Sequence, residues 1–290
     1  MHATPHIAPP PTGDELPEWL QPRVPASFKP ITTPARFCCI MQKGGSGKST
    51  TAVCLACELA LKGLRVRVWD VDAQLGGTTH WLTPQLDDGA DHEPANLLHL
   101  FKGEASPDEV TYPTRVPNLY VVPSYTSLKQ VELAPPPGVE QVIDWAINNT
   151  TDPYDVEITD CGPALGQLSV AALVGAPNVV IPLKASGFDL NALTELNRTL
   201  TLTKQRLAPQ LKIAAVLLSE VLKSNLTSEV FDALCNDYPD SLIMGIRQSV
   251  KAREASLESI RLPLHEYAPT ATVRKDFQYL AAQLVEVPTA

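Results

Sequence analysis

The sequence predicts an α/β domain with a mostly parallel, twisted sheet that helices cover on both faces. Two observations predict this fold class. Short apolar runs of strand length alternate with longer segments of helical periodicity, and a glycine-rich loop follows the first run directly. Parallel strands joined in this way bind ligands beyond their carboxyl ends. The chain has 290 residues, of which 44% are hydrophobic, so it is long enough for one large domain with a sizeable core.

The order of the expected elements supports one domain without an internal repeat. The expected strands are Phe37–Met41, Arg65–Val71, Leu119–Pro123, Asp155–Asp160, Val179–Leu183, Lys212–Leu218 and Leu242–Ile246. The expected helices are Lys48–Leu61, Val139–Ile147, Leu190–Arg206, Thr227–Asn236 and Thr270–Val285. Gly63 stands where a helix C-cap belongs, and Pro135-Pro136-Pro137-Gly138 indicates a loop rather than a domain linker.

Residues 1–34 are expected to form a proline-rich, largely disordered arm that precedes a domain of residues 35–290. Nine of the 27 prolines fall within this arm. Prolines at this density support neither a helix nor a central strand. The segment from Leu16 to Leu20, which contains Trp19, is either a short docking element or part of a tail that binds nothing.

Composition argues against several classes of protein. No run approaches the roughly 18 apolar residues that span a bilayer, and the N-terminus lacks the basic start and apolar run of a signal peptide, so we expect a cytoplasmic protein. Cys54 and Cys57 form a single C-x-x-C within an expected helix, whereas a zinc site would need a second pair. We therefore expect all six cysteines to be reduced core residues: Cys38, Cys39, Cys54, Cys57, Cys161 and Cys235.

The charge distribution leaves room for one local basic face. The net charge of −9 argues against a protein that coats nucleic acid over its whole surface. Residues 1–203 hold 13 Lys and Arg against 22 Asp and Glu, whereas residues 204–290 hold 10 against 10. A basic surface in the C-terminal part therefore remains possible.

The segment from Gln42 to Thr50 predicts a site for a polyphosphate. An apolar strand, a tight glycine turn and a helix start follow one another here, so backbone N–H groups line the turn and the helix N-terminus adds positive potential. Lys48 is placed to reach the β- and γ-phosphates, and the Ser49 hydroxyl to hold Mg²⁺. The expected cofactors are ATP and Mg²⁺. The expected nucleotide-binding residues are Gly44, Gly45, Ser46, Gly47, Lys48, Ser49 and Thr50.

The loop departs from the usual pattern G-x-x-x-x-G-K-[ST], because Gln42 stands at the first glycine position. The pattern K-G-G-x-G-K-[ST] fits and begins at Lys43. This form resembles the ParA/MinD family of P-loop ATPases, and Gln42 before Lys43 looks more like its ParA-type partition ATPases. The resemblance implies an ATPase that is weak without a partner, in which Lys43 crosses a dimer interface and touches the partner's nucleotide.

Two strand ends carry the expected catalytic and metal-binding carboxylates. Asp70 and Asp72 share one face at the end of the second expected strand, where a carboxylate orients a water or lies near Mg²⁺. The resemblance assigns Asp72 to activating the attacking water, alongside Lys43 and Lys48. It assigns Asp160 to Mg²⁺, partly through water. Glu157 interrupts the apolar run before Asp160, which indicates that one face of this strand is wetter than usual.

The resemblance extends from about Arg36 to Val285. It includes Val179–Leu183 with Asp189–Leu193, and the tail from Ile246 to Pro269. ATP is favoured over GTP, because the nearest match to a guanine-reading motif, Thr203 to Arg206, lacks the required acid.

The ParA resemblance implies a homodimer that forms on ATP binding, binds DNA without sequence preference and segregates a plasmid or chromosome. A ParB-like centromere-binding or cargo adaptor protein then stimulates hydrolysis, and the protein is nucleoid-associated. Arg247, Lys251 and Arg253 are the expected DNA contacts, because they form the dense basic cluster of the C-terminal part. The alternatives are a ParA-like positioner of protein cargo, a MinD-like division regulator or a scaffold without turnover. Membrane anchoring is not expected, because no basic amphipathic helix ends the sequence.

Overall fold

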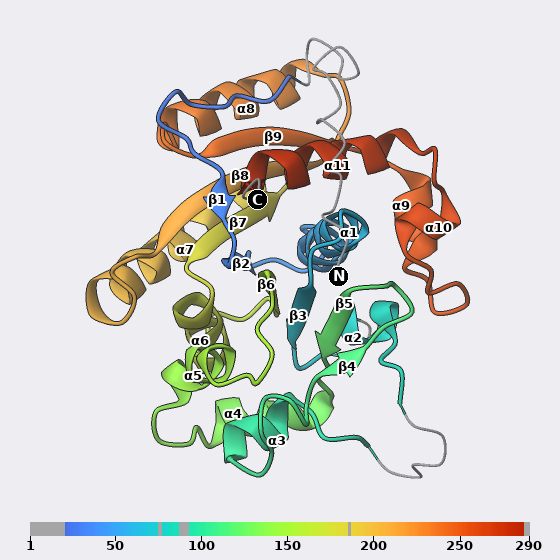
Figure 1. The fold of residues 1–290 in the computed structure, drawn as a ribbon. Helices are drawn as coiled ribbons and strands as arrows, with labels where there is room; N and C mark the ends of the chain where they lie inside the picture. Colours follow the sequence, from blue (N-terminus) through green and yellow to red (C-terminus); the bar gives the residue numbers. More distant parts are fainter. Residues whose placement is uncertain (1–20, 75–76, 87–92, 185–186, 287–290) are drawn as a thin grey trace.

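A twisted sheet of eight strands forms the centre of the molecule, with helices on both faces (Figure 1). The structure is a computed structural model that describes residues 21–74, 77–86, 93–184 and 187–286. The strand order is β4-β5-β3-β6-β2-β7-β8-β9, in which β4 runs antiparallel to its neighbour and the other strands pair in parallel. The strands are β2 (Ala35–Cys39), β3 (Val66–Val71), β4 (Tyr112–Pro113), β5 (Leu119–Val122), β6 (Val156–Cys161), β7 (Asn178–Leu183), β8 (Lys212–Val221) and β9 (Leu242–Arg247).

Each face of the sheet has its own buried core, because successive side chains of a strand point to opposite faces. Phe37 and Cys39 of β2 pack on one side, and Cys38 packs on the other. One core includes residues of α1 (Lys48–Leu61), α2 (Thr78–Leu82), α9 (Val250–Ala255), α10 (Leu264–Tyr267) and α11 (Thr272–Leu284). The other includes residues of α3 (Leu97–Lys102), α4 (Lys129–Leu133), α5 (Val142–Asn148), α6 (Gln167–Gly175), α7 (Gly187–Arg206) and α8 (Asn225–Asp237).

The predicted fold class is confirmed, and all seven expected strands and five expected helices are present within a few residues of their expected ends. The expected helix Val139–Ile147 is split into a 3₁₀ turn, η4 (Val139–Gln141), and α5. Helix α6 was not predicted, because its sequence is apolar on almost every side and shows no helical periodicity. The short elements α2, α3, α4, α9 and α10 and the 3₁₀ turn η3 (Thr126–Leu128) were also not predicted.

Residues 21–34 lie against the domain, which differs from the expectation of a largely disordered arm for this part of the chain. Arg23 forms an antiparallel bridge with Ile243, and β1 (Ile31–Thr32) pairs in parallel with β10 (Val285–Glu286). Phe28 packs against the core on the α11 side. These backbone pairs satisfy some of the N–H and C=O groups of the non-proline residues in this segment. Residues 1–20, including Leu16 to Leu20, lie outside the described residues.

A buried ion pair joins β3 and β6 where the sequence indicated a wetter strand face. The Arg67 guanidinium donates to both carboxylate oxygens of Glu157 at 2.7 and 3.0 Å, and the indole N–H of Trp69 donates to the same carboxylate at 2.7 Å. The Arg67 side chain is 0% exposed and that of Glu157 is 3% exposed, so the expectation of a wetter face was wrong. The registers of β3 and β6 place the two residues opposite each other.

Replacing Arg67 alone should destabilise the fold strongly. Arg67→Met leaves the Glu157 charge buried without its partner, and we expect a loss of about 3–5 kcal/mol in the free energy of unfolding. The double variant Arg67→Met/Glu157→Leu removes both charges and should recover most of that loss. Urea unfolding measures both values, and equal stability of the single and double variants would contradict this account.

Candidate functional site

The loop between β2 and α1 has the conformation of a phosphate-binding turn. Gly45 and Gly47 have φ values of 73° and 102°, which side chains other than glycine rarely adopt. A Cβ atom on Gly47 would also lie 3.0 Å from the Ser219 hydroxyl oxygen. Lys48 is 7% exposed, and its Nζ donates to the carbonyl oxygen of Lys43 at 3.0 Å, which holds the turn closed.

A cavity of about 250 Å³ opens over this turn at the carboxyl edge of the sheet. Most of the residues that the sequence predicted for the site are brought together around it, although they come from three separate segments. The lining residues are Gly44, Gly45, Gly47, Lys48, Ser49, Thr50, Asp72, Gln74, Gly77 and Pro163. Ser46 belongs to the same turn but is fully buried beneath it.

Two buried carboxylates face each other across the paired ends of β3 and β6. Asp70 and Asp160 occupy opposite register positions and are 2% and 0% exposed. Burial, together with the neighbouring Asp160 charge, raises the pKa of Asp70 to about 7. Burial also raises the pKa of Asp160 to about 6, although Ser49, Thr78 and Lys48 act to lower it. Burial of two neighbouring carboxylates disfavours their charged forms, and an added cation would favour those forms.

The donor set around Asp160 fits a divalent cation such as Mg²⁺. The Thr78 hydroxyl donates to Oδ2 of Asp160 at 2.8 Å, whereas Oδ1 is buried and makes no hydrogen bond. The Ser49 hydroxyl lies close enough to favour the charged form of the carboxylate. Among the described residues, no group of three or more His, Cys, Asp and Glu side chains forms a metal cage. A few oxygen ligands completed by phosphate and water suit Mg²⁺.

Asp72 lies at the rim of the cavity, in contact with the segment that follows β6. Its Oδ1 accepts from the backbone N–H of Gln74 at 2.9 Å, and a Cβ atom on Gly162 would lie 2.9 Å from the same oxygen. Partial burial raises the pKa of Asp72, and the charges of Lys48 and Lys129 act against this increase. The Asp72 carboxylate therefore sits between the phosphate turn and the segment after Asp160.

A segment that was not predicted from the sequence connects these two loops. The Ser124 hydroxyl donates to the carbonyl oxygen of Asp72 at 2.6 Å. Further along, on α4, Glu132 accepts from the N–H groups of Gln167 and Leu168 at 3.1 Å each, and so caps α6. A Cβ atom on Gly166 would lie 2.3 Å from this carboxylate. The segment from Ser124 to Glu132 thus contacts both loops beside the cavity.

A second, smaller pocket adjoins the phosphate turn on its β8 and β9 side. Gly47, Thr50 and Thr51 line it from the turn and α1, and Glu220 and Phe277 line it from the opposite side. The remainder of its lining comes from β8, β9, α9 and α11, which the sequence did not assign to the nucleotide.

The three predicted DNA contacts do not form one exposed cluster. Both Nε and Nη2 of Arg247 donate to the fully buried Asp276 carboxylate, and its Nη2 also donates to the carbonyl oxygen of Thr272. The Arg247 side chain is only 16% exposed, whereas those of Lys251 and Arg253 are 56% and 55% exposed. Arg247 is therefore held inside the fold and is a poor candidate for a phosphate contact.

Comparison with known proteins identifies the family. A family model described as an AAA domain matches residues 36–213, more than half of the chain. The chain is 33% identical over 218 residues to the sporulation initiation inhibitor protein Soj of Bacillus subtilis, covering 74% of this chain and 84% of Soj. It is 34% identical over 190 residues to the chromosome partitioning protein ParA of Myxococcus xanthus, covering 64% of this chain and 65% of that protein.

Solved structures agree on the fold. A complex of a Cyanothece McdA variant with ATP superposes with a TM-score of 0.73 at 21% identity and covers 90% of this chain and 100% of that one. The fold and the site thus define a P-loop nucleotide-binding protein with the K-G-G-x-G-K turn. The chain belongs to the ParA/Soj family of P-loop ATPases. No helix in the described part of the chain has the length and apolar run that a membrane span requires.

Loss of the Glu132 cap should slow turnover without weakening nucleotide binding. In Glu132→Ala, α6 and the segment after Asp160 lose two hydrogen bonds, and a lost cap is worth about 1 kcal/mol. We expect kcat to fall about fivefold with an unchanged ATP dissociation constant. Glu132→Gln keeps one acceptor oxygen and should recover part of the rate.

Glu109 offers a matched control, because it also accepts two hydrogen bonds, from the N–H and hydroxyl of Ser106, but lies outside the site. Glu109→Ala should leave kcat unchanged. Equal effects of the two alanine variants would contradict a positioning role for Glu132.

Proposed function

We propose that this protein is an ATP-dependent partition motor. It dimerises on ATP, binds DNA without sequence preference in that state, and releases DNA after hydrolysis stimulated by a ParB-like centromere-binding or cargo adaptor protein. The observation that carries the proposal is the K-G-G-x-G-K turn, closed by Lys48 on Lys43, with Asp72 beside the same cavity. Relatives named as chromosome partitioning proteins support it. We place the protein in the cytoplasm, at the nucleoid.

Different residues around the cavity would bind the phosphates, bind the metal ion and activate the water. The backbone N–H groups of the turn and Lys48 would hold the β- and γ-phosphates. The Ser49 hydroxyl and Asp160 would hold Mg²⁺, partly through water, and bound Mg²⁺ neutralises charge on the phosphates. Asp72 would orient the attacking water, since its carboxylate lies at the cavity rim. The adjoining pocket beside Gly47 and Thr50 would take the nucleoside.

Lys43 is proposed to act across a dimer interface. Lys43 stands at the start of the turn, its carbonyl oxygen accepts from Lys48 and its side chain is half-buried, which supports a role at the edge of the phosphate turn. An amine supplied there by a second copy would stabilise negative charge on the phosphates. ATP would then hold two subunits together, and loss of the γ-phosphate would let them separate.

Lys251 and Arg253 remain the proposed DNA contacts. Both side chains are more than half exposed, and the surface ion pairs that they form with Glu254 and Glu220 are weak compared with contacts to a polyanion. Arg247 is not among the proposed DNA contacts, because its buried ion pair with Asp276 contributes to the fold. The positioning of a protein cargo would use the same motor, and only the partner and the surface it binds would differ.

Asp72→Ala should separate ATP binding from hydrolysis. Removing a group that orients the water should lower kcat by about 10²-fold or more, while the ATP dissociation constant and ATP-dependent dimerisation persist. Single-turnover hydrolysis and light scattering with ATP measure these quantities. Normal turnover in this variant would remove Asp72 from the proposed role. A monomer under all nucleotide conditions would contradict the dimer.

Reversing the charges of Lys251 and Arg253 should weaken DNA binding. We expect Lys251→Glu/Arg253→Glu to lower affinity for nonspecific duplex DNA at least tenfold near 0.1 M salt. The slope of log affinity against log salt should shrink by about 0.9 for each lost phosphate contact. Lys204→Glu/Lys212→Glu is a matched control at the amino end of β8, where both lysines are exposed. Equal DNA affinity of the two double variants would rule out the proposed contacts.

A further inference from the structure

A short helix joins the two buried carboxylates beside the phosphate turn. The Thr78 hydroxyl donates to Oδ2 of Asp160 at 2.8 Å. The backbone N–H of the next residue, Thr79, donates to Oδ2 of Asp70 at 2.7 Å. Both threonines belong to the first turn of α2, so this turn is hydrogen-bonded to the paired ends of β3 and β6.

The first turn of α2 is held from two sides. Thr78 is 0% exposed and Thr79 is 6% exposed. Gly77, which precedes them and lines the cavity over the phosphate turn, lies against Asp70: a Cβ atom on Gly77 would be 3.6 Å from both carboxylate oxygens. On the other side, the Thr79 hydroxyl oxygen accepts from the backbone N–H of Ser124 at 3.0 Å. Contacts with β3 and with the segment after β5 thus fix the position of the Thr78 hydroxyl.

The Thr78 hydroxyl distinguishes the two carboxylate oxygens of Asp160. Oδ2 has Thr78 as its donor, whereas Oδ1 is buried and accepts no hydrogen bond in the described part of the chain. The terminal torsion of an aspartate side chain has broad, roughly two-fold preferences, so the side chain alone does not fix which oxygen faces a ligand. A donor on one oxygen fixes that choice, and hydrogen bonds of this kind orient the carboxylates that bind metal ions.

We propose that Thr78 is a positioning residue for the divalent cation of this site. Its hydroxyl holds Oδ2 of Asp160, so that Oδ1 is left for the cation or for a water bound to it. Asp70 contributes indirectly, because it anchors the turn that carries Thr78. The inference rests on the proposed function, since it requires that the cavity bind ATP together with Mg²⁺, and it adds a residue that no sequence pattern assigned to the site.

Replacing Thr78 with valine tests this role through binding rather than turnover. Thr78→Val keeps the shape of the side chain and removes the donor. Titrating Mg²⁺ into the full chain with a fluorescent, non-hydrolysable ATP analogue gives the Mg²⁺ concentration at half-maximal binding. We expect this concentration to rise about tenfold, because losing a hydrogen-bond partner of a metal ligand typically costs about 10–100-fold in metal affinity. Affinity for the analogue in EDTA should stay unchanged, and Thr78→Ser, which keeps the hydroxyl, should restore the wild-type Mg²⁺ requirement.

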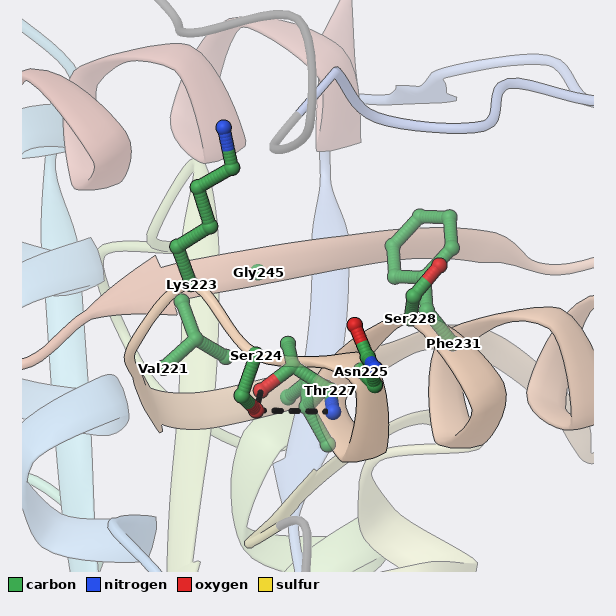
Figure 2. A pocket seen from close by; sticks show the side chains of 9 residues that line it. Val221, Lys223, Ser224, Asn225, Thr227, Ser228, Phe231 and Gly245 are labelled. Carbon is green, nitrogen blue, oxygen red and sulfur yellow. Dashed lines mark hydrogen bonds between the residues drawn. The ribbon is translucent and has the colours of Figure 1, made fainter.

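Thr227 offers a matched control in the first turn of another helix, α8. It is 9% exposed, and its hydroxyl donates to the carbonyl oxygen of Leu222 at 2.8 Å. It lines a cavity of about 380 Å³ bordered by α8, β8 and β9, where Figure 2 shows it hydrogen-bonded to Ser224. This cavity shares no lining residue with the cavity over the phosphate turn. Thr227→Val therefore loses a comparable hydrogen bond and should leave the Mg²⁺ requirement unchanged.

An unchanged Mg²⁺ requirement in Thr78→Val would overturn the proposal, as would an equal increase in Thr227→Val or a failure of Thr78→Ser to restore the requirement. If circular dichroism shows that Thr78→Val does not fold, Thr78→Ala and Thr78→Ser make the same comparison. A wild-type chain that binds no ATP analogue at any Mg²⁺ concentration would contradict the proposed function and this inference with it. Normal wild-type binding with an unaltered Thr78→Val would overturn the inference alone.

Discussion

The crowding of negative charge at the carboxyl edge of the sheet is the constraint on which the site depends. The register of β3 and β6 puts Asp70 directly opposite Asp160, and both carboxylates are buried. Lys48, hydroxyls and backbone N–H groups compensate only part of this charge, so burial raises the pKa of both acids. A bound cation would favour their ionised forms. The two carboxylates are therefore suited to a divalent cation, in line with the single unpartnered oxygen of Asp160.

The same edge of the sheet brings together the loops after β3 and β6, which border the cavity over the phosphate turn. Asp72 lies against Gly162, so the loop after β3 packs against the loop after β6. The segment after β5 strengthens this coupling, because Ser124 holds the backbone of Asp72 and Glu132 holds the start of α6. Interactions that span both loops can transmit a change at the phosphates to the surface of α4, provided that the pair of loops has two arrangements.

The sequence predicted what local patterns encode. The strands, α1 and the phosphate turn follow from hydrophobic periodicity and the positions of glycine, and the strand ends located Asp72 and Asp160 at one edge. It could not reveal partners that are distant along the chain. Glu157 indicated a wetter strand face, whereas it forms a buried ion pair with Arg67. Arg247 was expected on the surface, whereas it is paired with the buried Asp276 carboxylate. No sequence pattern marked Glu132, because its capping role depends on where the first turn of α6 lies in space.

The outer edge of β9 shows how the fold protects an otherwise open strand, since unpaired edges invite association with other chains. Arg23 covers the edge at Ile243, and the Asp276 carboxylate accepts from the backbone N–H of Arg247 at 2.9 Å. Between these two points lies Gly245, beside a cavity and exposed leucines. Residues far apart along the chain thus cover the edge of β9 at two points, one through a backbone pair and one through a side-chain carboxylate.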